Sequence, residues 1–297
     1  MKIGVLINHG ENPESGEVPT YAEIREMALA IEENGFDSAW VVDHLFFRPE
    51  AHKTVGIWEC WTLLTALAEA TSRIELGTLV LCNPFRDPAL LAKMAHTLDE
   101  VSLGRLILGM GCGWHQPEFD AFGFPFDYRV SRFDEALQII RPLLDGKSVD
   151  FDGKFYQVKD CVISPLGPRS GGIPLLVASK SPRMVQLTAR YADQWNTAWL
   201  GDPEPLGERI AMMKQACLDE KRDPATLAIT VGTSVAFPDL GEGRSFAADP
   251  FVGSLDEIAA AFLAYEKAGA DHLQIGISPY GLPALVRLAE AMHIYRR

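Results

Sequence analysis

The chain has 297 residues, of which 47% are hydrophobic and 23% charged, and its formal net charge is −13. This amount of apolar material is enough for a sizeable core, arranged as two domains or as one large α/β domain. The acidic balance argues against a surface that holds nucleic acid or anionic lipid. We therefore expect a soluble acidic enzyme.

Targeting segments and cysteine or metal clusters are not indicated by the sequence. The apolar run in residues 1–8 is too short for a signal peptide, and no later apolar stretch reaches membrane-spanning length, which predicts a cytoplasmic protein. The five cysteines are odd in number and widely spread, so neither a disulfide framework nor a zinc cluster is expected. No set of carboxylates and histidines has a recognisable metal-ligand spacing.

Short β-branched runs alternate with longer amphipathic runs along the whole chain, a pattern typical of parallel β-α units. The predicted strands are residues 2–8, 38–43, 74–81, 105–111, 173–178, 194–197, 227–236 and 272–277. The predicted helices are residues 20–34, 60–70, 88–101, 132–144, 182–191, 206–220, 256–267 and 282–295. Eight such units predict a (β/α)8 TIM barrel over residues 1–297. A doubly wound sheet is the alternative, but no G-x-G-x-x-G follows the first strand.

Two segments interrupt the repeat. Residues 145–172 hold a hairpin signal at 151–158 followed by an irregular loop, and we interpret them as an insertion in the barrel. Residues 237–253 are rich in Gly, Pro and Asp and follow the seventh strand. They form either a lid or a mobile loop.

In a barrel of this kind, chemistry collects where the strands end at the C-terminal face. The fourth strand ends in GMGCGW at 109–114, where alternating glycines either let a flat ligand approach the backbone or make room for large neighbours. For Gly109, room for large neighbours explains the glycine as well as the approach of a ligand does. For Gly113, room for large neighbours is the weaker explanation.

The second and fifth strands end in polar residues. Asp43 and His44 provide a carboxylate and an imidazole suited to proton transfer, although one of them is expected to be structural. Ser179, Lys180 and Ser181 precede a helix that begins with proline, a composition that favours a bound phosphate. The alternative for this segment is a simple N-cap beside a solvated lysine.

The chain contains neither a G-x-S-x-G nucleophile elbow nor a phosphate-binding loop with G-K-S. Without a metal set, a nucleophile or a nucleotide loop, the economical source of reactivity is a bound organic cofactor.

Seven segments occur in a fixed order along the middle of the chain. They are LGTLV at 76–80, FRDPALLAKM at 85–94, TLD at 97–99, SLGR at 102–105, GMGCGW at 109–114, EFDAFGFPF at 118–126 and RVSRFDEAL at 129–137. The series resembles the bacterial luciferase-like superfamily, and within it the coenzyme F420-dependent oxidoreductases. The likeness extends from Lys2 to Ile277.

The resemblance implies a luciferase-like TIM barrel with insertions that binds F420 or FMN at its C-terminal mouth. The implied catalytic residues are His44 and Asp43. The implied cofactor-binding residues are Leu79 and Val80 (at a non-prolyl cis peptide), Cys82, Cys112, Gly113, Trp114, Ala178, Ser179 and Lys180. Phe46, Phe47, Trp195 and Trp199 predict an apolar or aromatic substrate pocket.

Two positions depart from the resemblance. Many relatives have Gly-Gly where this chain has Ala178 and Ser179, and Lys180 is expected to compensate by its charge. Sugar-phosphate dehydrogenases of the family have a glutamate at the position of Trp114, which argues against a sugar-phosphate substrate.

Together these features predict an F420-dependent oxidoreductase that transfers hydride to a small apolar or aromatic substrate, with His44 donating a proton or a hydrogen bond. The alternatives are an FMN-dependent monooxygenase with a reductase partner, a flavin-binding barrel that no longer catalyses and, remotely, a cofactor-free lyase. Family habit suggests a homodimer.

Overall fold

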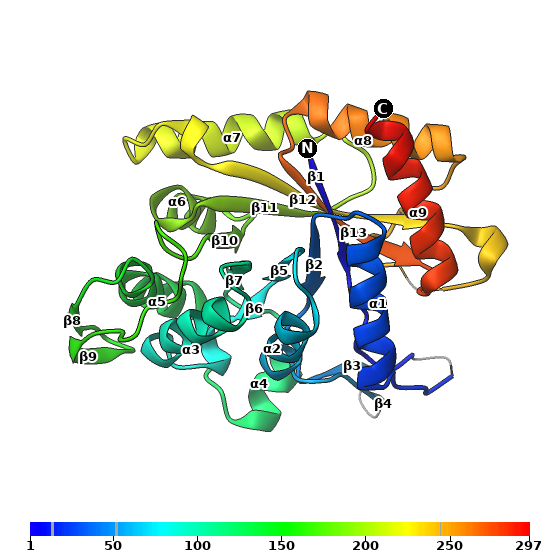
Figure 1. The fold of residues 1–297 in the computed structure, drawn as a ribbon. Helices are drawn as coiled ribbons and strands as arrows, with labels where there is room; N and C mark the ends of the chain where they lie inside the picture. The colour runs from blue at the N-terminus through cyan, green and yellow to red at the C-terminus, as the bar shows by residue number, and fades with distance from the viewer. Residues whose placement is uncertain (13–14, 51–52, 244) are drawn as a thin grey trace.

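The computed structural model describes residues 1–12, 15–50, 53–243 and 245–297, and its sheet strands surround one central axis (Figure 1). The strands are β1 (Lys2–Leu6), β2 (Ser38–Val41), β3 (Phe46–Glu50), β4 (Lys53–Gly56), β5 (Glu75–Thr78), β6 (Leu81–Cys82), β7 (Leu106–Gly111), β8 (Val149–Asp152), β9 (Gln157–Cys161), β10 (Leu175–Ala178), β11 (Gln194–Leu200), β12 (Ala228–Ala236) and β13 (His272–Ser278). The helices are α1 (Tyr21–Glu33), α2 (Cys60–Ala70), α3 (Pro88–Val101), α4 (Gln116–Phe122), α5 (Arg129–Leu144), α6 (Pro182–Tyr191), α7 (Leu206–Asp219), α8 (Leu255–Ala268) and α9 (Leu282–Tyr295).

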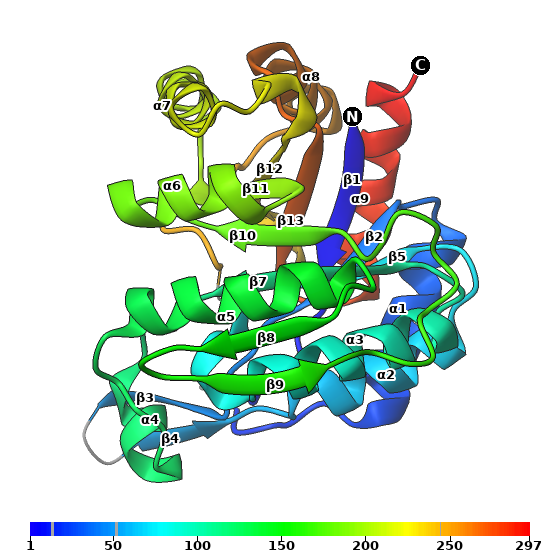
Figure 2. The same cartoon turned by 90° about the vertical axis from the view of Figure 1, so that its left-hand side faces the viewer.

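The main sheet closes on itself. Its strand order is β10-β11-β12-β13-β1-β2-β5-β7, and a further parallel pairing of β10 with β7 joins the two ends, with Leu175 opposite Leu108. All pairings in this ring are parallel, and the intervening helices lie outside it (Figure 2). The predicted (β/α)8 barrel is therefore confirmed, and the doubly wound alternative is wrong.

The helices begin where capping chemistry places them. Asp87 accepts hydrogen bonds from the backbone N–H groups of Ala89 and Leu90 at the start of α3, with Pro88 in the first turn. Ser254 and Glu257 form a reciprocal capping box at the start of α8. Gly269 ends α8 with φ of 106°. Local sequence alone thus sets several helix boundaries.

The barrel interior is filled with side chains. Leu6, Trp40, Ile107 and Leu176 form a buried cluster with Leu79, whereas their strand neighbours belong to the larger core beneath the helices. Alternation along a strand therefore points this cluster inward. Because the centre is packed, a ligand has room only at the mouth.

The mouth carries additions that the sequence analysis missed. The antiparallel pair β3–β4 lies beside α4 in two views (Figures 1 and 2), and Phe46 on β3 packs against Phe122 on α4 with ring centroids 6.1 Å apart. β3 was not predicted because Pro49 interrupts the strand pattern in the sequence.

The predicted insertion at residues 145–172 contains the antiparallel pair β8–β9.

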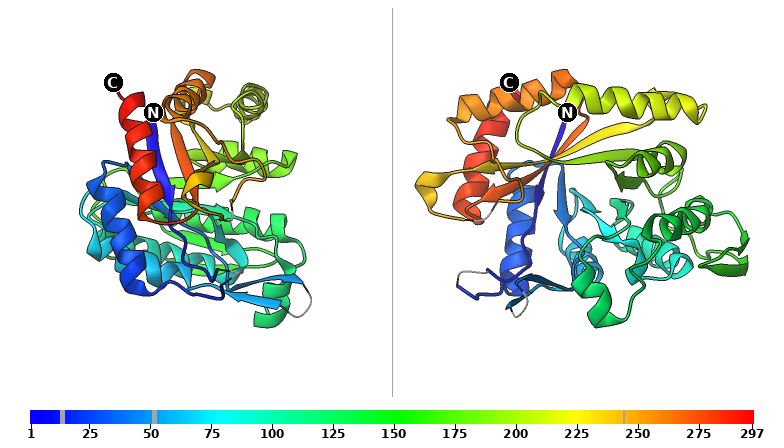
Figure 3. Two further views of the ribbon diagram at one scale, coloured as in Figure 1. Left: turned by 90° about the vertical axis from the view of Figure 1, so that its right-hand side faces the viewer. Right: turned by 180° about the vertical axis from the view of Figure 1, so that it is seen from behind.

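The two chain ends lie next to each other (Figure 3). The amino group of Met1 donates a hydrogen bond of 3.1 Å to the hydroxyl of Tyr295. Among the described residues, no helix combines the length and apolar character needed to cross a membrane.

Candidate functional site

A cavity of about 690 Å³ opens at the C-terminal mouth of the barrel. Its walls come from the ends of β1, β2, β5, β7, β10, β11 and β13, together with the β4 segment and residues of the loop after β12. This volume lies within the range of small-molecule and cofactor sites. The predicted site residues that line it are Asp43, His44, Phe47, Leu79, Val80, Cys82, Gly113, Trp114, Ala178 and Trp199.

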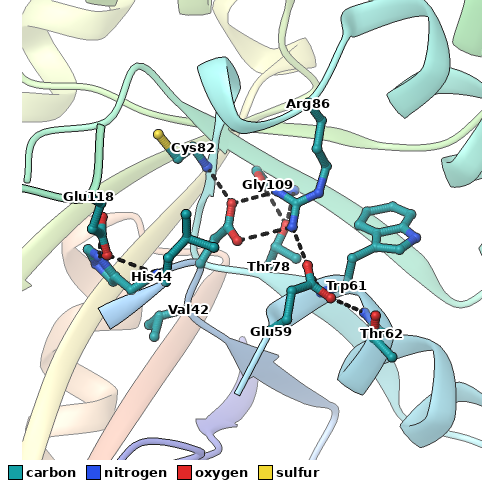
Figure 4. A network of polar contacts seen from close by, with 12 residues as sticks. Val42, His44, Glu59, Trp61, Thr62, Thr78, Cys82, Arg86, Gly109 and Glu118 are labelled. Atoms are coloured by element: carbon teal, nitrogen blue, oxygen red, sulfur yellow. Dashed lines mark hydrogen bonds and ion pairs between the residues drawn. The ribbon is translucent and has the colours of Figure 1, made fainter. Parts of the chain in front are cut away.

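His44 is held by a glutamate on α4, the short helix that follows β7 (Figure 4). The Oε1 atom of Glu118 lies 2.9 Å from Nδ1 of His44 and accepts a 2.9 Å hydrogen bond from the backbone N–H of Leu45. Glu118 is 1% exposed. A carboxylate at this place requires Nδ1 to carry a proton, so Nε2 is the ring nitrogen left for a ligand.

Asp43, in contrast, is part of the framework. Its carboxylate accepts hydrogen bonds from the Nη1 atom of Arg86 at 2.7 Å and from the backbone N–H of Cys82 at 2.8 Å. Arg86 also donates to Glu59, which caps α2 (Figure 4). Burial alone would lower the pKa of Arg86, but the charge of Asp43 raises it. The network joins the ends of β2 and β5 to α2.

A ledge of backbone follows β5. The Leu79-Val80 peptide is cis, as the resemblance implied, and both residues line the cavity. Cys82 extends the ledge, and burial raises the pKa of its thiol, which stays protonated. Cys112 packs against the core and does not reach the cavity wall.

Gly109 lies within β7, and Gly113 follows that strand. A Cβ on Gly109 would lie 1.8 Å from the backbone oxygen of Thr78, so this glycine permits close approach of β5 and β7. Gly113 has φ of 76° and lines the cavity. A Cβ on Gly113 would lie 2.5 Å from Sγ of Cys82, so packing explains both glycines, and the backbone of Gly113 also forms part of the cavity wall.

The fifth strand end is less open than the sequence predicted. The hydroxyl of Ser179 bonds to Oγ1 of Thr188 on α6 at 2.8 Å, and its backbone N–H bonds to the carbonyl of Asn196. Ser181 occupies the N-cap position of α6 without a side-chain cap hydrogen bond, and Lys180 is exposed, so the alternative of an N-cap beside a solvated lysine agrees with the structure. Of this segment, Ala178 alone reaches the cavity wall.

Lys180 lies close to a second cation. Burial and the nearby charge of Arg209 lower the pKa of Lys180. In the described part of the chain, no ion pair involves either side chain, and Arg209 donates to the hydroxyl of Thr197 at 2.6 Å. Two neighbouring cations without an acidic partner favour a bound anion.

The structure brings some of the predicted aromatic residues together at the cavity. Phe47, Trp114 and Trp199 line the cavity. Trp195 does not, because it is fully buried and donates from Nε1 to the carbonyl of Ser179 at 3.0 Å. Phe46 also lies outside the wall, packed beneath the guanidinium of Arg48. Trp195 and Phe46 are therefore corrected from substrate contacts to supporting residues.

The sequence analysis missed several residues of the cavity. One of them is Glu118, which is buried on the short helix α4 and pairs with His44. Asn196, Ser245, Phe246 and Tyr280 also line the wall. The only signal for these residues was their position at strand ends or in the loop at 237–253. Among the residues that the structure describes, no group of three or more His, Cys, Asp or Glu side chains is arranged to hold a metal ion.

Two of the solved structures that resemble this chain hold a ligand derived from F420 or FMN. An F420-dependent secondary alcohol dehydrogenase, in complex with an F420-acetone adduct, has a TM-score of 0.80 and 19% identity over 100% of this chain and 99% of its own. A riboflavin lyase with modified FMN has a TM-score of 0.82 and 16% identity over 100% and 91%. At these identities the likeness supports the fold.

Sequence relatives fall into two groups. The 5,10-methylenetetrahydromethanopterin reductase of Archaeoglobus fulgidus is 34% identical over 58% of this chain and 48% of its own length. The F420-dependent glucose-6-phosphate dehydrogenase of Mycobacterium avium is 36% identical over 58% and 51%. The chain thus spans about half the length of these two relatives. The pyrimidine monooxygenase RutA of Escherichia coli is 32% identical over 91% of this chain and 73% of its own.

A family model described as luciferase-like monooxygenase matches residues 1–242, which contain His44, Glu118, the cis peptide and the cation pair. The relatives in this family are oxidoreductases and monooxygenases that use F420 or a flavin. On the match of sequence, barrel and site, the chain belongs to the luciferase-like monooxygenase family.

Proposed function

We propose that this protein is a coenzyme F420-dependent oxidoreductase that transfers hydride between the deazaflavin and a small, planar organic substrate. The observation that carries the proposal is His44, anchored by Glu118 at Nδ1 and facing the cavity beside the Leu79-Val80 ledge. The relative named as an F420-dependent glucose-6-phosphate dehydrogenase supports the choice of cofactor.

The cavity has the chemistry that a deazaflavin needs. Leu79, Val80 and Gly113 present an apolar surface for a flat ring. Beyond the cavity wall, Lys180 with Arg209 offers positive charge for an anionic tail. When bound, reduced F420 supplies a hydride, which is chemistry that none of these side chains provides. A cavity of about 690 Å³ leaves room for a small substrate beside the ring.

His44 has the acid–base role in this proposal. With Nδ1 protonated against Glu118, the neutral ring has a lone pair at Nε2 and accepts a proton there. The protonated ring donates from the same atom. Neutral His44 would therefore accept the proton that oxidation of an alcohol releases. Charged His44 would donate the proton that reduction of a carbonyl requires.

An FMN-dependent monooxygenase is the second candidate. It is favoured by the pyrimidine monooxygenase relative, whose similarity extends over 91% of this chain. In that case a reductase partner supplies the reduced flavin. A barrel that binds flavin without catalysis is a third outcome, and would leave His44 without influence on any turnover.

Side-by-side titration of the purified protein with F420 and FMN tests the proposal, with cofactor absorbance and fluorescence as readouts. Tight binding of F420 with weak binding of FMN is the expected result. Preferential binding of FMN would overturn the proposal in favour of oxygen-dependent chemistry. The His44→Gln variant is expected to retain cofactor binding and lose turnover, whereas unchanged turnover would remove His44 from the mechanism.

A further inference from the structure

We propose that Asn196, Ser245 and Tyr280 form a substrate subsite that recognises a planar ring with an N–H group beside a carbonyl, as in a lactam or an imide. The inference rests on the proposed function, because it assumes that a cofactor ring occupies the opposite part of the same cavity. All three residues line that cavity.

Asn196 offers an unused acceptor. Its Nδ2 donates to Oγ1 of Thr230 and to Oε1 of Gln274, both at 3.0 Å, which fixes the orientation of the amide. The side chain is 1% exposed, and its Oδ1 atom has no hydrogen-bond partner in the described residues. A buried carbonyl oxygen without a hydrogen-bond partner destabilises the protein unless a ligand donates to it. An N–H group of the substrate meets this need.

Tyr280 and Ser245 supply the complementary donors. Burial raises the pKa of Tyr280, and a backbone hydrogen bond from Asn8 offsets only part of this rise, so the phenol keeps its proton at neutral pH. The hydroxyls of Tyr280 and Ser245 have no acceptor within the described ranges. A substrate carbonyl beside the N–H group would accept a hydrogen bond from one of them.

The shape of this part of the cavity fits a flat ring. Trp199 and Phe246 stack with ring centroids 5.2 Å apart and an interplanar angle of 26°, and both face the cavity. Phe246 is fixed on the loop after β12, because the next residue, Ala247, donates from its backbone N–H to Oγ of Ser234 at 3.0 Å. An aromatic wall beside fixed polar atoms is typical of sites that orient a planar ligand.

The position of the subsite separates it from the ledge. The strand order places β11, β12 and β13 across the barrel from β5, whose end carries Leu79 and Val80. Flavin and deazaflavin rings also carry an imide edge, so the same atoms have a second possible ligand. We assign them to the substrate because the ledge, on which the cofactor ring would lie, is at the other side of the mouth.

Calorimetric titration with 2-pyridone and N-methyl-2-pyridone tests the assignment. These probes share a planar ring and a carbonyl, and only the first has an N–H group. Cofactor-loaded and cofactor-free protein are both titrated, after the cofactor dissociation constant has been measured separately. The expected result is a preference of roughly 10-fold or more for 2-pyridone.

Two variants test which residues cause the preference for 2-pyridone. Asn196→Ala is expected to abolish it, and Tyr280→Phe is expected to weaken both probes by roughly 5-fold to 10-fold. Because Asn196 also supports Thr230 and Gln274, Tyr280→Phe keeps the test decisive if the first variant does not fold. Tyr295→Phe is the matched control, since Tyr295 lies next to the N-terminus, and it is expected to bind both probes normally.

Three results would overturn the inference. The first is no binding of 2-pyridone at millimolar concentration to either form of the protein. The second is a preference that survives Asn196→Ala. The third is a loss of cofactor affinity in both variants with unchanged probe binding, which would assign these atoms to the cofactor ring. If the protein does not bind F420, the proposed function fails. The subsite is then tested by the probe titrations of the cofactor-free protein.

Discussion

Glu118 binds His44 and the backbone that follows it with one carboxylate. Its two oxygens lie 2.9 and 3.2 Å from Nδ1 of His44, and Oε1 also accepts from the backbone N–H groups of Leu45 and Phe46 at 2.9 and 3.3 Å. Each of these partners donates, which suits an ionised carboxylate. Glu118 therefore sets both the tautomer of the ring and the course of the chain after β2.

Glu118→Gln is expected to lower kcat by about 100-fold with little change in KM or in cofactor affinity. The glutamine oxygen still accepts from the backbone, but its amide group presents a donor to Nδ1 and favours the opposite tautomer of His44. Nitrogen-15 NMR of the His44 ring provides a readout apart from turnover and is expected to report Nε2 as the protonated atom.

The control for this substitution is Glu69→Gln, which changes an exposed glutamate on α2. It is expected to leave turnover and the His44 spectrum unchanged. An unaltered spectrum with reduced turnover in Glu118→Gln would argue against tautomer control and for a structural effect of Glu118.

Cofactor affinity is expected to weaken as pH rises toward the alkaline range. Burial and Arg209 lower the pKa of Lys180, so its charge is present below that pKa and is lost at a lower pH than for an ordinary lysine. An anionic tail binds only the charged form well. Fluorescence titration of F420 between pH 7 and 10 measures the effect, with circular dichroism to exclude unfolding.

Lys180→Met is the matched variant for the pH experiment. It is expected to bind the cofactor about 10-fold more weakly at pH 7 and to show little further loss at higher pH. A steep alkaline loss that persists in Lys180→Met would move the effect to another group.

The barrel was predictable because its signals are local. Runs of buried β-branched residues alternate with helices that carry their own caps, as at Asp87 and Ser254, so both the number and the order of the elements follow from the sequence. The hairpin β3–β4 and the short helix α4 were missed because each is stabilised by packing at the mouth, such as Phe46 against Phe122.

The candidate site was predictable only where strand ends supply it. Asp43 and His44 are adjacent in sequence, yet the first bonds to Arg86 and the second to Glu118, and this division depends on elements far along the chain. Trp195 was misassigned because alternation along β11 turns it away from the cavity while its neighbour Asn196 lines the wall. Because adjacent side chains on a strand point to opposite faces, Asn196 faces the cavity and Trp195 does not.

Gly109→Ala is expected to lower the free energy of unfolding by more than an ordinary overpacked substitution does, which costs about 1–3 kcal/mol. The new methyl group would lie 1.8 Å from the carbonyl oxygen of Thr78, and backbone cannot move aside as a side chain does. Urea unfolding followed by circular dichroism measures the loss. Gly207→Ala, on α7 with no atom within 4 Å of the added Cβ, is the control and is expected to retain full stability. Equal stability of both variants would contradict the close approach of β5 and β7.

Asp43→Asn is expected to reduce the free energy of unfolding by about 3 kcal/mol, because it leaves the buried guanidinium of Arg86 with only the partly exposed Glu59 as an acidic partner. Urea unfolding measures the change. The control is Asp239→Asn, which breaks an exposed pair with Arg287 and is expected to leave the free energy of unfolding almost unchanged. Unaltered stability in Asp43→Asn together with lost turnover would instead make Asp43 a participant in the chemistry, because the framework role requires that its charge stabilise the fold.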